Sequence, residues 1–494
     1  MSVRVRYAPS PTGLQHIGGV RTALFNYFFA KSQGGDFILR IEDTDRERYS
    51  DESLQDLYDT FSWLGIEWDE GPDKGGEYGP YVQSERFDMY REYADKLIAE
   101  GKAYKCYCTP ERLEALRTEQ QKDKKAHQGY DRHCRDLTPE QQAEYEKQGI
   151  KPVVRFKIPL DGKTVFHDVL LGDVKRKNSD ISPDPVLLKS DGFPTYHLAN
   201  IIDDHHMNIT HIMRAQEWLP SGPLHILLYQ AFEWDPPTYC HLPMVMGKDG
   251  QKLSKRHGST SLRDFIAKGY LPEAIINYIS LIGWAYDDSR EFFDKADLEK
   301  LFVLEKLNKA PGVFDYKKLD WFNGQYIRKL SDEELKAKII PYLQDSGNVD
   351  NPPSEAQDAM LNGLIPIVKE RLKLLSDIVP MTAFLFSDIS GYPAEDLIPK
   401  KKDAASTLEI LKLGRPLIEK MAELGPDGEA QDEALEAAFK ALSEESGFKL
   451  GELLSPLRVA VTGSRVSPPL FASIRLLGLK TALERIDEAV KKLE

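Results

Sequence analysis

The first hundred residues switch between short apolar runs and longer segments in which apolar side chains recur every three or four positions. Val3–Tyr7 and Asp36–Ile41 are short apolar runs of the kind that form buried strands. Val20–Ser32, Asp51–Leu64 and Ser84–Gly101 have apolar residues at helical spacing, and a glycine closes the last of them. Strands and helices in alternation indicate a parallel sheet of the α/β type.

The pattern changes between residues 104 and 190, which are polar, charged and rich in glutamine. Short strands are expected there at Val153–Ile158 and Thr164–Val169. The α/β pattern then resumes with an apolar run at Ile209–Met213 and a helical stretch around Leu219–Phe232. We therefore expect an α+β insertion within the sheet domain.

The last third of the chain has helical periodicity and few strand candidates. The stretch from Leu262 to Tyr326 is already largely helical. Further helices are expected at Glu334–Leu343, Glu355–Leu375, Ala404–Leu424 and Gln431–Ser446. The expected fold is thus a Rossmann-like parallel-sheet domain with an α+β insertion, followed by an all-α C-terminal region.

Composition narrows the functional class. The 494 residues are enough for three to five domains, and 41% of them are hydrophobic. A net charge of −14 argues against a general nucleic-acid coat protein or a membrane-surface binder, although local basic patches could still bind one folded RNA. No apolar run is long enough to span a bilayer, so a cytoplasmic protein without DNA or membrane partners is expected. Four cysteines do not form a disulfide framework and are expected to be reduced.

The loop between the first strand and the first helix carries candidate chemistry. It contains Pro9, Pro11, Gly13, His16 and the pair Gly18-Gly19, and it leads into a helix N-terminus. Such a terminus has partial positive charge and free N–H groups, so it attracts phosphate. The alternative is that the loop merely turns the chain and that His16 is an ordinary capping histidine. The loop alone does not decide between these readings.

A second segment distinguishes them. Pro9–Gly18 and Lys252–Arg256 together resemble the two signature motifs of the class I aminoacyl-tRNA synthetases. The flanking sequence is similar to the bacterial glutamyl-tRNA synthetases, in stretches at 21–26, 40–45, 196–200, 214–218 and 456–458. The resemblance covers nearly the whole chain. The chain departs from the class pattern at Gly19, where a second histidine is usual, at Leu253, which replaces methionine, and at Arg256, which replaces serine.

The resemblance implies a glutamate–tRNA ligase. Such an enzyme activates L-glutamate with ATP to glutamyl-adenylate and transfers it to the 3′-terminal adenosine of tRNA-Glu. His16, Lys252 and Lys255 would be catalytic, because charge grows on the departing phosphates. ATP would bind with Mg²⁺ held through its phosphates. The implied ATP-binding residues are Pro9, Ser10, Thr12, Gly13, His16, Gly18, Gly19, Lys252, Leu253, Ser254, Lys255 and Arg256.

Glutamate needs a cation for its side-chain carboxylate and an anion for its ammonium group. Arg6 and Arg214 are the candidate guanidinium groups, since a planar fork matches a carboxylate, and Glu42 is the candidate anion. A neutral glutamine side chain would not satisfy such an arginine, so no editing domain is expected. The resemblance implies a glutamate pocket made of Arg6, Ala8, Ser10, Glu42, Tyr196, Asn200 and Arg214.

The resemblance also divides the chain. The catalytic domain would comprise residues 1–105 and 191–247, and residues 106–190 would bind the acceptor stem of the tRNA. Residues 248–330 would form a helical domain that contacts the stem and carries the lysine loop. Residues 331–494 would bind the anticodon in two subdomains, with Arg371 as a candidate contact. A monomer is the usual state of the family.

The cysteines have a non-random spacing. Cys106, Cys108 and Cys134 resemble the zinc ligands of some bacterial family members, in which the fourth ligand often lies two residues after the third cysteine. Here that position is Asp136, and His133 and His127 are alternatives. Without the resemblance, the cysteines would be read as buried apolar residues or adventitious thiols. Cys240 is expected in the core.

Three competing interpretations were weighed. A truncated paralogue that glutamylates a modified base in tRNA-Asp would lack an anticodon domain, whereas about 160 residues follow Leu330 here. Glutaminyl-tRNA synthetase shares the catalytic half, but its C-terminal part is built from β-strands. A non-catalytic tRNA-binding module would not need His16, Lys252 and Lys255.

Overall fold

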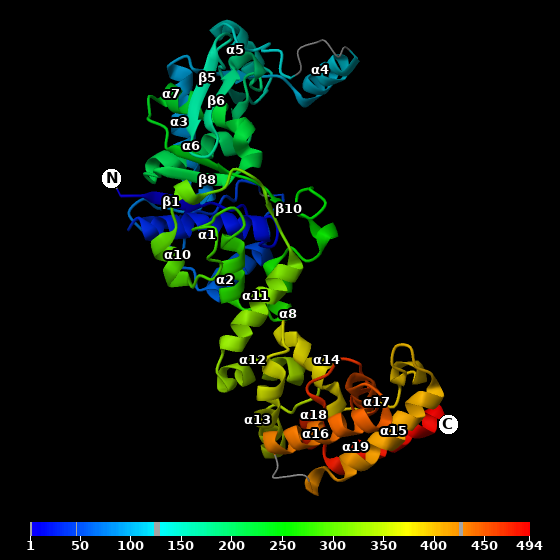
Figure 1. The fold of residues 1–494 in the computed structure, drawn as a ribbon. Coiled ribbons are helices and arrows are strands. Elements are labelled where there is room, and N and C mark those ends of the chain that lie inside the picture. The colour runs from blue at the N-terminus through cyan, green and yellow to red at the C-terminus, as the bar shows by residue number, and fades with distance from the viewer. Residues whose placement is uncertain (1, 46, 123–128, 424–427) are drawn as a thin grey trace. The chain divides into compact units, whose positions relative to one another are not determined.

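The computed structural model describes the whole chain except residues 1, 46, 123–128 and 424–427. The chain forms two compact units, each of which is considered separately (Figure 1). The first unit comprises residues 1–265 and 272–316, and the second comprises residues 266–271 and 317–494. Helices α8 (Leu262–Lys268) and α11 (Tyr316–Lys329) contain the boundaries between them.

The first unit has a parallel sheet at its centre, as the alternating pattern predicted. Strand β1 pairs with β2, and β8 pairs with β9, both in parallel. The Thr210 N–H donates to the Arg4 carbonyl oxygen over 2.9 Å and so links the start of β8 to β1. The bounds are β1 (Arg4–Tyr7), β2 (Asp36–Leu39), β8 (His211–Ala215) and β9 (Thr238–Leu242).

A hairpin from the polar middle segment extends this sheet. Strands β5 (Lys163–Asp168) and β6 (Gly172–Lys177) are antiparallel to each other. Asp168 pairs in parallel with Tyr239 of β9, which gives the order β6-β5-β9-β8. Because of this pairing, the end of β5 lies beside a strand of the parallel sheet.

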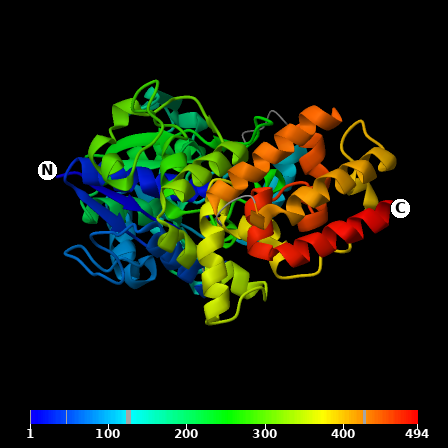
Figure 2. The same cartoon turned by 60° about the horizontal axis from the view of Figure 1, so that its bottom comes forward.

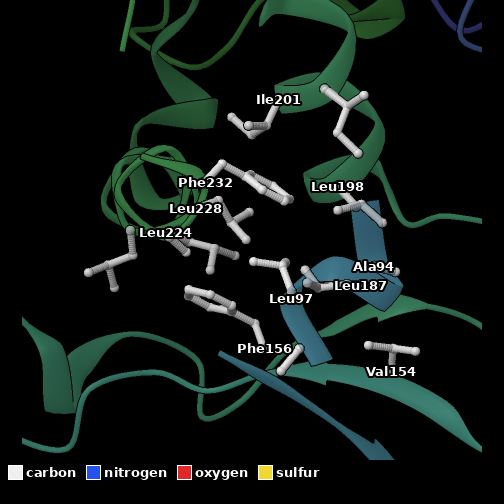
Figure 3. Close-up of a cluster of buried hydrophobic side chains, with 14 of the residues drawn as sticks. Ala94, Leu97, Val154, Phe156, Leu187, Leu198, Ile201, Leu224, Leu228 and Phe232 are labelled. Carbon is white, nitrogen blue, oxygen red and sulfur yellow. The ribbon is translucent and has the colours of Figure 1, made fainter. Parts of the chain in front are cut away.

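A second, antiparallel sheet supports a separate apolar core. Its order is β3 (Ala103–Cys106), β4 (Val153–Phe156) and β7 (Val186–Leu188). Figure 3 shows side chains of this core, among them Leu97, Phe156 and Leu228, pointing toward one another. They come from the sheet and from α3 (Phe87–Ala99), α6 (Tyr196–His206) and α7 (Gly222–Phe232). Burying such side chains contributes about 1.5–3 kcal/mol each.

The remaining elements of the first unit flank these sheets. Helix α1 packs between β1, β2 and β8 on one side and α9 and α10 on the other. Helices α4 and α5 lie in the polar segment, and the periodicity did not predict them because they bury almost no apolar residues. The bounds are α1 (Ile17–Ser32), α2 (Asp51–Leu64), α4 (Pro110–Lys122), α5 (Pro139–Lys147), β10 (Val245–Met246), α9 (Pro272–Ser280), α10 (Lys295–Leu301) and β11 (Gly312–Val313).

The second unit is helical throughout its described residues, as predicted for the C-terminal region. Figure 2 shows its helices, coloured yellow to red, packed against one another. The bounds are α12 (Asp332–Asp345), α13 (Glu355–Lys369), α14 (Ile378–Thr382), α15 (Ala404–Glu419), α16 (Glu429–Ser446), α17 (Leu450–Thr462), α18 (Leu470–Leu477) and α19 (Leu479–Leu493). Leu411, Leu457 and Ile486 meet in the core of α15, α17 and α19.

Some predicted helices end earlier than expected. The helix predicted to reach Leu375 stops at Lys369, and the backbone then turns so that the Leu374 N–H donates to the Asp377 carboxylate over 2.9 Å. No described helix is long and apolar enough to cross a membrane.

Candidate active site

A cavity of about 900 Å³ opens in the first unit. It lies at the carboxyl ends of β1 and β8, which is where open α/β sheets place their ligands. The predicted residues that line it are Arg6, Ala8, Ser10, Thr12, Gly13, His16, Gly18, Gly19, Glu42, Tyr196, Asn200, Arg214, Lys252, Leu253, Ser254 and Lys255. The two signature segments therefore meet at one site.

Two residues of the predicted set do not line the cavity. The Pro9 carbonyl oxygen accepts the Glu42 N–H over 3.0 Å, so Pro9 fixes the backbone at the pocket from outside it. Arg256 pairs with Asp249 over 3.5 Å, and its side chain is 62% exposed. Neither side chain is in a position to bind ATP in this structure.

His16 caps the helix that begins the site. Its Nδ1 accepts the Gly19 N–H over 3.2 Å, so the ring proton lies on Nε2, which remains a donor. Burial, together with nearby Lys252, lowers the pKa of His16 and keeps the ring neutral at pH 7. The Ile17 N–H is also occupied, by the Thr260 carbonyl oxygen at 3.0 Å. The helix end thus offers fewer free amides than the sequence suggested.

The glycine at position 19 has a steric reason. A Cβ atom there would lie 3.0 Å from the Tyr7 hydroxyl oxygen and 3.8 Å from the His16 ring. A histidine would crowd both neighbours, so the site is built around a single imidazole.

The lysine loop reaches the cavity between anchored ends. The Leu253 N–H donates to the Val245 carbonyl oxygen over 2.9 Å, and Ser261 forms a bridge with His16. Lys252 Nζ lies 2.5 Å from Glu217 Oε2, a partner that the sequence did not single out although it lies in the matched stretch 214–218. Lys255 has no carboxylate within 4.0 Å among the described residues. Its charge is therefore available to an anionic ligand.

The two candidate arginines differ in their partners. Arg6 is bound by both carboxylate oxygens of Asp204, at 3.0 and 3.1 Å, and is 4% exposed. Asp204 also binds Arg40 over 2.7 Å, and Arg40 binds Glu42 over 3.0 Å. Burial raises the pKa of Glu42, while the Arg40 guanidinium opposes that shift. The charge of Arg6 is thus already balanced by the protein.

Arg214 contacts only neutral groups among the described residues. It donates to His241 Nε2 at 3.0 Å, to the Tyr196 hydroxyl at 3.2 Å and to the Trp218 carbonyl oxygen at 3.3 Å. A buried guanidinium without a carboxylate is costly unless a ligand supplies one. The geometry therefore favours Arg214 over Arg6 as the group that binds a substrate carboxylate.

The cysteine cluster lies apart from the cavity. The sulfur atoms of Cys106, Cys108 and Cys134 are all within 4.8 Å of one another. The hydroxyl of Tyr130, which the sequence analysis missed, lies 3.3 Å from Cys106 Sγ and 3.6 Å from Cys108 Sγ. Hydrogen bonds from the other two thiols lower the pKa of Cys106. A thiolate in this cluster is a suitable zinc ligand.

The predicted fourth ligands do not join the three sulfurs. Asp136 and His133 are not members of the group that could hold a metal, and His127 lies outside the described residues. Tyr130 lies four residues before Cys134, a spacing that carries no zinc signal by itself. Cys240 is fully buried, as predicted.

The candidate anticodon residue lies in the second unit. Arg371 is exposed just after α13. Burial lowers the pKa of Arg458, and the charge of Arg371 lowers it further. Two guanidinium groups thus act on each other within one unit.

The chain matches two family models. Residues 2–321 match the catalytic domain of the class I tRNA synthetases (E and Q), and residues 334–490 match an anticodon binding domain. The fold and the site define a class I aminoacyl-tRNA synthetase. The chain belongs to the E and Q family of these ligases.

The similar proteins are specific. The chain is 57% identical to a glutamate–tRNA ligase of Borreliella burgdorferi and 55% identical to one of Treponema denticola. The matches cover 98% and 99% of both chains, respectively. A solved glutamate–tRNA ligase of Elizabethkingia meningosepticum, in complex with its amino acid, has a TM-score of 0.84 at 35% identity and full coverage of both chains.

Proposed function

We propose that this chain is a glutamate–tRNA ligase that makes glutamyl-adenylate from L-glutamate and ATP and transfers the glutamyl group to the 3′-terminal adenosine of tRNA-Glu. The observation that carries the proposal is the cavity that combines both signature segments with Arg214. Arg214 is buried at 5% exposure and has no carboxylate partner among the described residues. An anionic amino-acid side chain would supply that partner.

Activation would proceed by in-line displacement. An α-carboxylate oxygen of glutamate bonds to the α-phosphorus of ATP, while the bond from that phosphorus to the bridging oxygen breaks and pyrophosphate leaves. Lys255 would stabilise the growing negative charge, and His16 Nε2–H would donate to a phosphate oxygen. Magnesium bound to the phosphates would neutralise charge there. Catalysis would rest on positioning and electrostatics.

Lys252 would exchange partners when ATP binds. Its ammonium group now lies against Glu217, and both side chains are about half exposed. An exposed ion pair of this kind contributes about 0–1 kcal/mol, so triphosphate can compete for the lysine.

The tRNA would contact several parts of the chain. Residues 106–190 would bind the acceptor stem, residues 248–330 would contact the stem beyond it, and residues 331–494 would read the anticodon, with Arg371 as one contact. The catalytic domain would then comprise residues 1–105 and 191–247. The match of residues 334–490 to an anticodon binding domain supports the last assignment.

A structural zinc ion would stabilise the 106–190 segment. The donor set that fits is three cysteine sulfurs and the Tyr130 hydroxyl, since these four groups converge. Asp136 and His133 would be dispensable. We further propose a cytoplasmic monomer, in keeping with four free thiols.

Pyrophosphate exchange tests the proposal. Purified protein is incubated with ATP, labelled pyrophosphate and tRNA, and with glutamate, glutamine or aspartate in parallel. The proposal expects exchange with glutamate that exceeds exchange with the other two by a factor of about 100 or more. Exchange with glutamine alone, or with none of the three, would refute it.

A further inference from the structure

Two buried residues reach Arg214 from the strand beside it and from the hairpin. His241, on β9, accepts Arg214 Nε–H at its Nε2 over 3.0 Å. Asp168, at the end of β5, places Oδ2 2.7 Å from His241 Nδ1 and accepts the His241 backbone N–H over 3.0 Å. Both side chains are fully buried, and neither lines the cavity.

The chemistry of these contacts fixes the imidazole. A guanidinium group cannot accept a hydrogen bond, so His241 Nε2 must be unprotonated. The proton of the ring therefore lies on Nδ1, where the Asp168 carboxylate accepts it. Asp168 has a further role in the backbone, because its Oδ1 accepts the Leu170 and Leu171 N–H groups at 3.0 Å. These bonds hold the carboxylate rigidly beneath the ring.

The same arrangement occurs on a second side of Arg214. His225 Nδ1 lies 3.3 Å from an Arg214 terminal nitrogen and must accept, while its Nε2 lies 3.0 Å from His197 Nδ1. Both imidazoles thus hold Arg214 as neutral acceptors. Arg6 differs, because Asp204 binds it directly and balances its charge.

We propose that Asp168 and His241 are positioning residues, which hold Arg214 toward the side-chain carboxylate of the substrate without neutralising its positive charge. The imidazole separates the carboxylate of Asp168 from the guanidinium, so orientation and charge balance are provided by different groups. This inference rests on the proposed function, since it requires a substrate with an anionic side chain. It assigns the selection of an anionic over a neutral side chain to residues that do not touch the substrate.

Three variants test the role of His241. His241→Gln keeps a neutral acceptor near the position of Nε2, whereas His241→Leu removes it, and Cys240→Ala is a control for lost packing at the next buried position of β9. In tRNA charging, His241→Leu should raise KM for glutamate about 10- to 100-fold. Its KM for ATP should stay within twofold of wild type. His241→Gln should recover most of the loss, and Cys240→Ala should leave KM for glutamate unchanged.

The charging reaction also reports selectivity. The ratio of kcat/KM for glutamate to that for glutamine should fall in His241→Leu and recover in His241→Gln. A wild-type KM and ratio in His241→Leu would overturn the inference. Equal damage in His241→Gln and His241→Leu would overturn it as well, because an acceptor would then not be what matters.

Asp168→Asn provides a second test that does not depend on the folding of His241→Leu. The amide would reverse the proton position on His241, so KM for glutamate should rise in the wild-type background. In the His241→Gln background it should cause no further rise, because no imidazole remains to be oriented. An equal rise in both backgrounds would show a merely structural role and refute the inference. A wild-type enzyme that does not charge tRNA with glutamate would refute the proposed function separately.

Discussion

Glu217 Oε2 lies 2.5 Å from Lys252 Nζ across the mouth of the cavity. The pair links the strand end that carries Arg214 to the lysine loop, and both side chains remain accessible to solvent. The carboxylate therefore occupies the lysine that the proposed mechanism assigns to the phosphates of ATP.

Glu217→Gln should bind ATP more tightly. The change releases Lys252 and removes a negative charge near the triphosphate, so KM for ATP should fall by up to about fivefold. Glu52→Gln is a matched control, because Glu52 forms a comparably exposed pair with Arg263 at 2.7 Å and does not line the cavity. Steady-state kinetics at low ionic strength measure the effect. A higher KM for ATP in Glu217→Gln would contradict this account of the pair.

Lys255→Ala should lose catalysis while the fold is retained. Lys255 has no ion-pair partner among the described residues, so its loss should leave the melting temperature unchanged. Removing the charge from the leaving pyrophosphate should lower the rate of exchange about 100- to 1,000-fold. Arg256→Ala is the neighbouring control and should retain most of the activity, because Arg256 pairs with Asp249 outside the cavity. Equal losses in both variants would show that the two positions act alike.

Acid should destabilise the first unit through His197. Burial and the charge of Arg214 lower the pKa of His197 to about 4, whereas an unfolded histidine has a pKa near 6.5. The unfolded state binds more protons between these values, so stability present above pH 6.5 is lost as the pH falls toward 4. Between pH 7 and pH 5 the loss from this group is about 2 kcal/mol.

His197→Asn isolates this contribution. The amide can still accept from His225 and has no proton to take up. Urea unfolding at pH 7 and pH 5 should show a smaller acid effect in the variant than in wild type. The same pH dependence in both proteins would rule out His197 as the responsible group.

Tyr130→Phe should weaken zinc binding if the hydroxyl is the fourth ligand. Loss of one of four ligands should lower zinc affinity at least about tenfold, as measured by competition with a chelator. Asp136→Asn should have no effect, because Asp136 is not part of the cluster. The opposite ranking of the two variants would return the fourth position to Asp136. Purified wild-type protein without stoichiometric zinc would remove the site.

Much of the fold followed from local sequence. The periodicity of residues 51–64 predicted a helix with the bounds that α2 has, because Ser50 caps one end and Gly65, at φ 62°, ends the other. Helices that bury little apolar surface gave no such signal, as α5 illustrates. The helix predicted around Leu219 begins instead at Gly222, since the preceding residues form a short 3-10 turn that contains Pro220.

The site was predictable only where its residues form continuous motifs. His16 and Lys255 lie in such motifs and do meet in the cavity. His241 and Asp168 are 73 residues apart, and only the pairing of β5 with β9 brings them together. Tyr130 is joined to the cysteines in the same way, by tertiary structure. Sequence also could not show that Asp204 balances the charge of Arg6 and leaves Arg214 as the unpaired cation.

A competition experiment tests the central claim most directly. The purified protein is given ATP, Mg²⁺, tRNA-Glu and equal concentrations of glutamate, glutamine and aspartate. The charged tRNA is then digested with ribonuclease, and the aminoacyl-adenosine released from the 3′ end is identified by mass spectrometry. The account predicts glutamyl-adenosine as the dominant product, because the unpaired charge of Arg214 requires an anionic side chain of the right length. Glutaminyl- or aspartyl-adenosine as the main product, or no aminoacyl-adenosine at all, would contradict it.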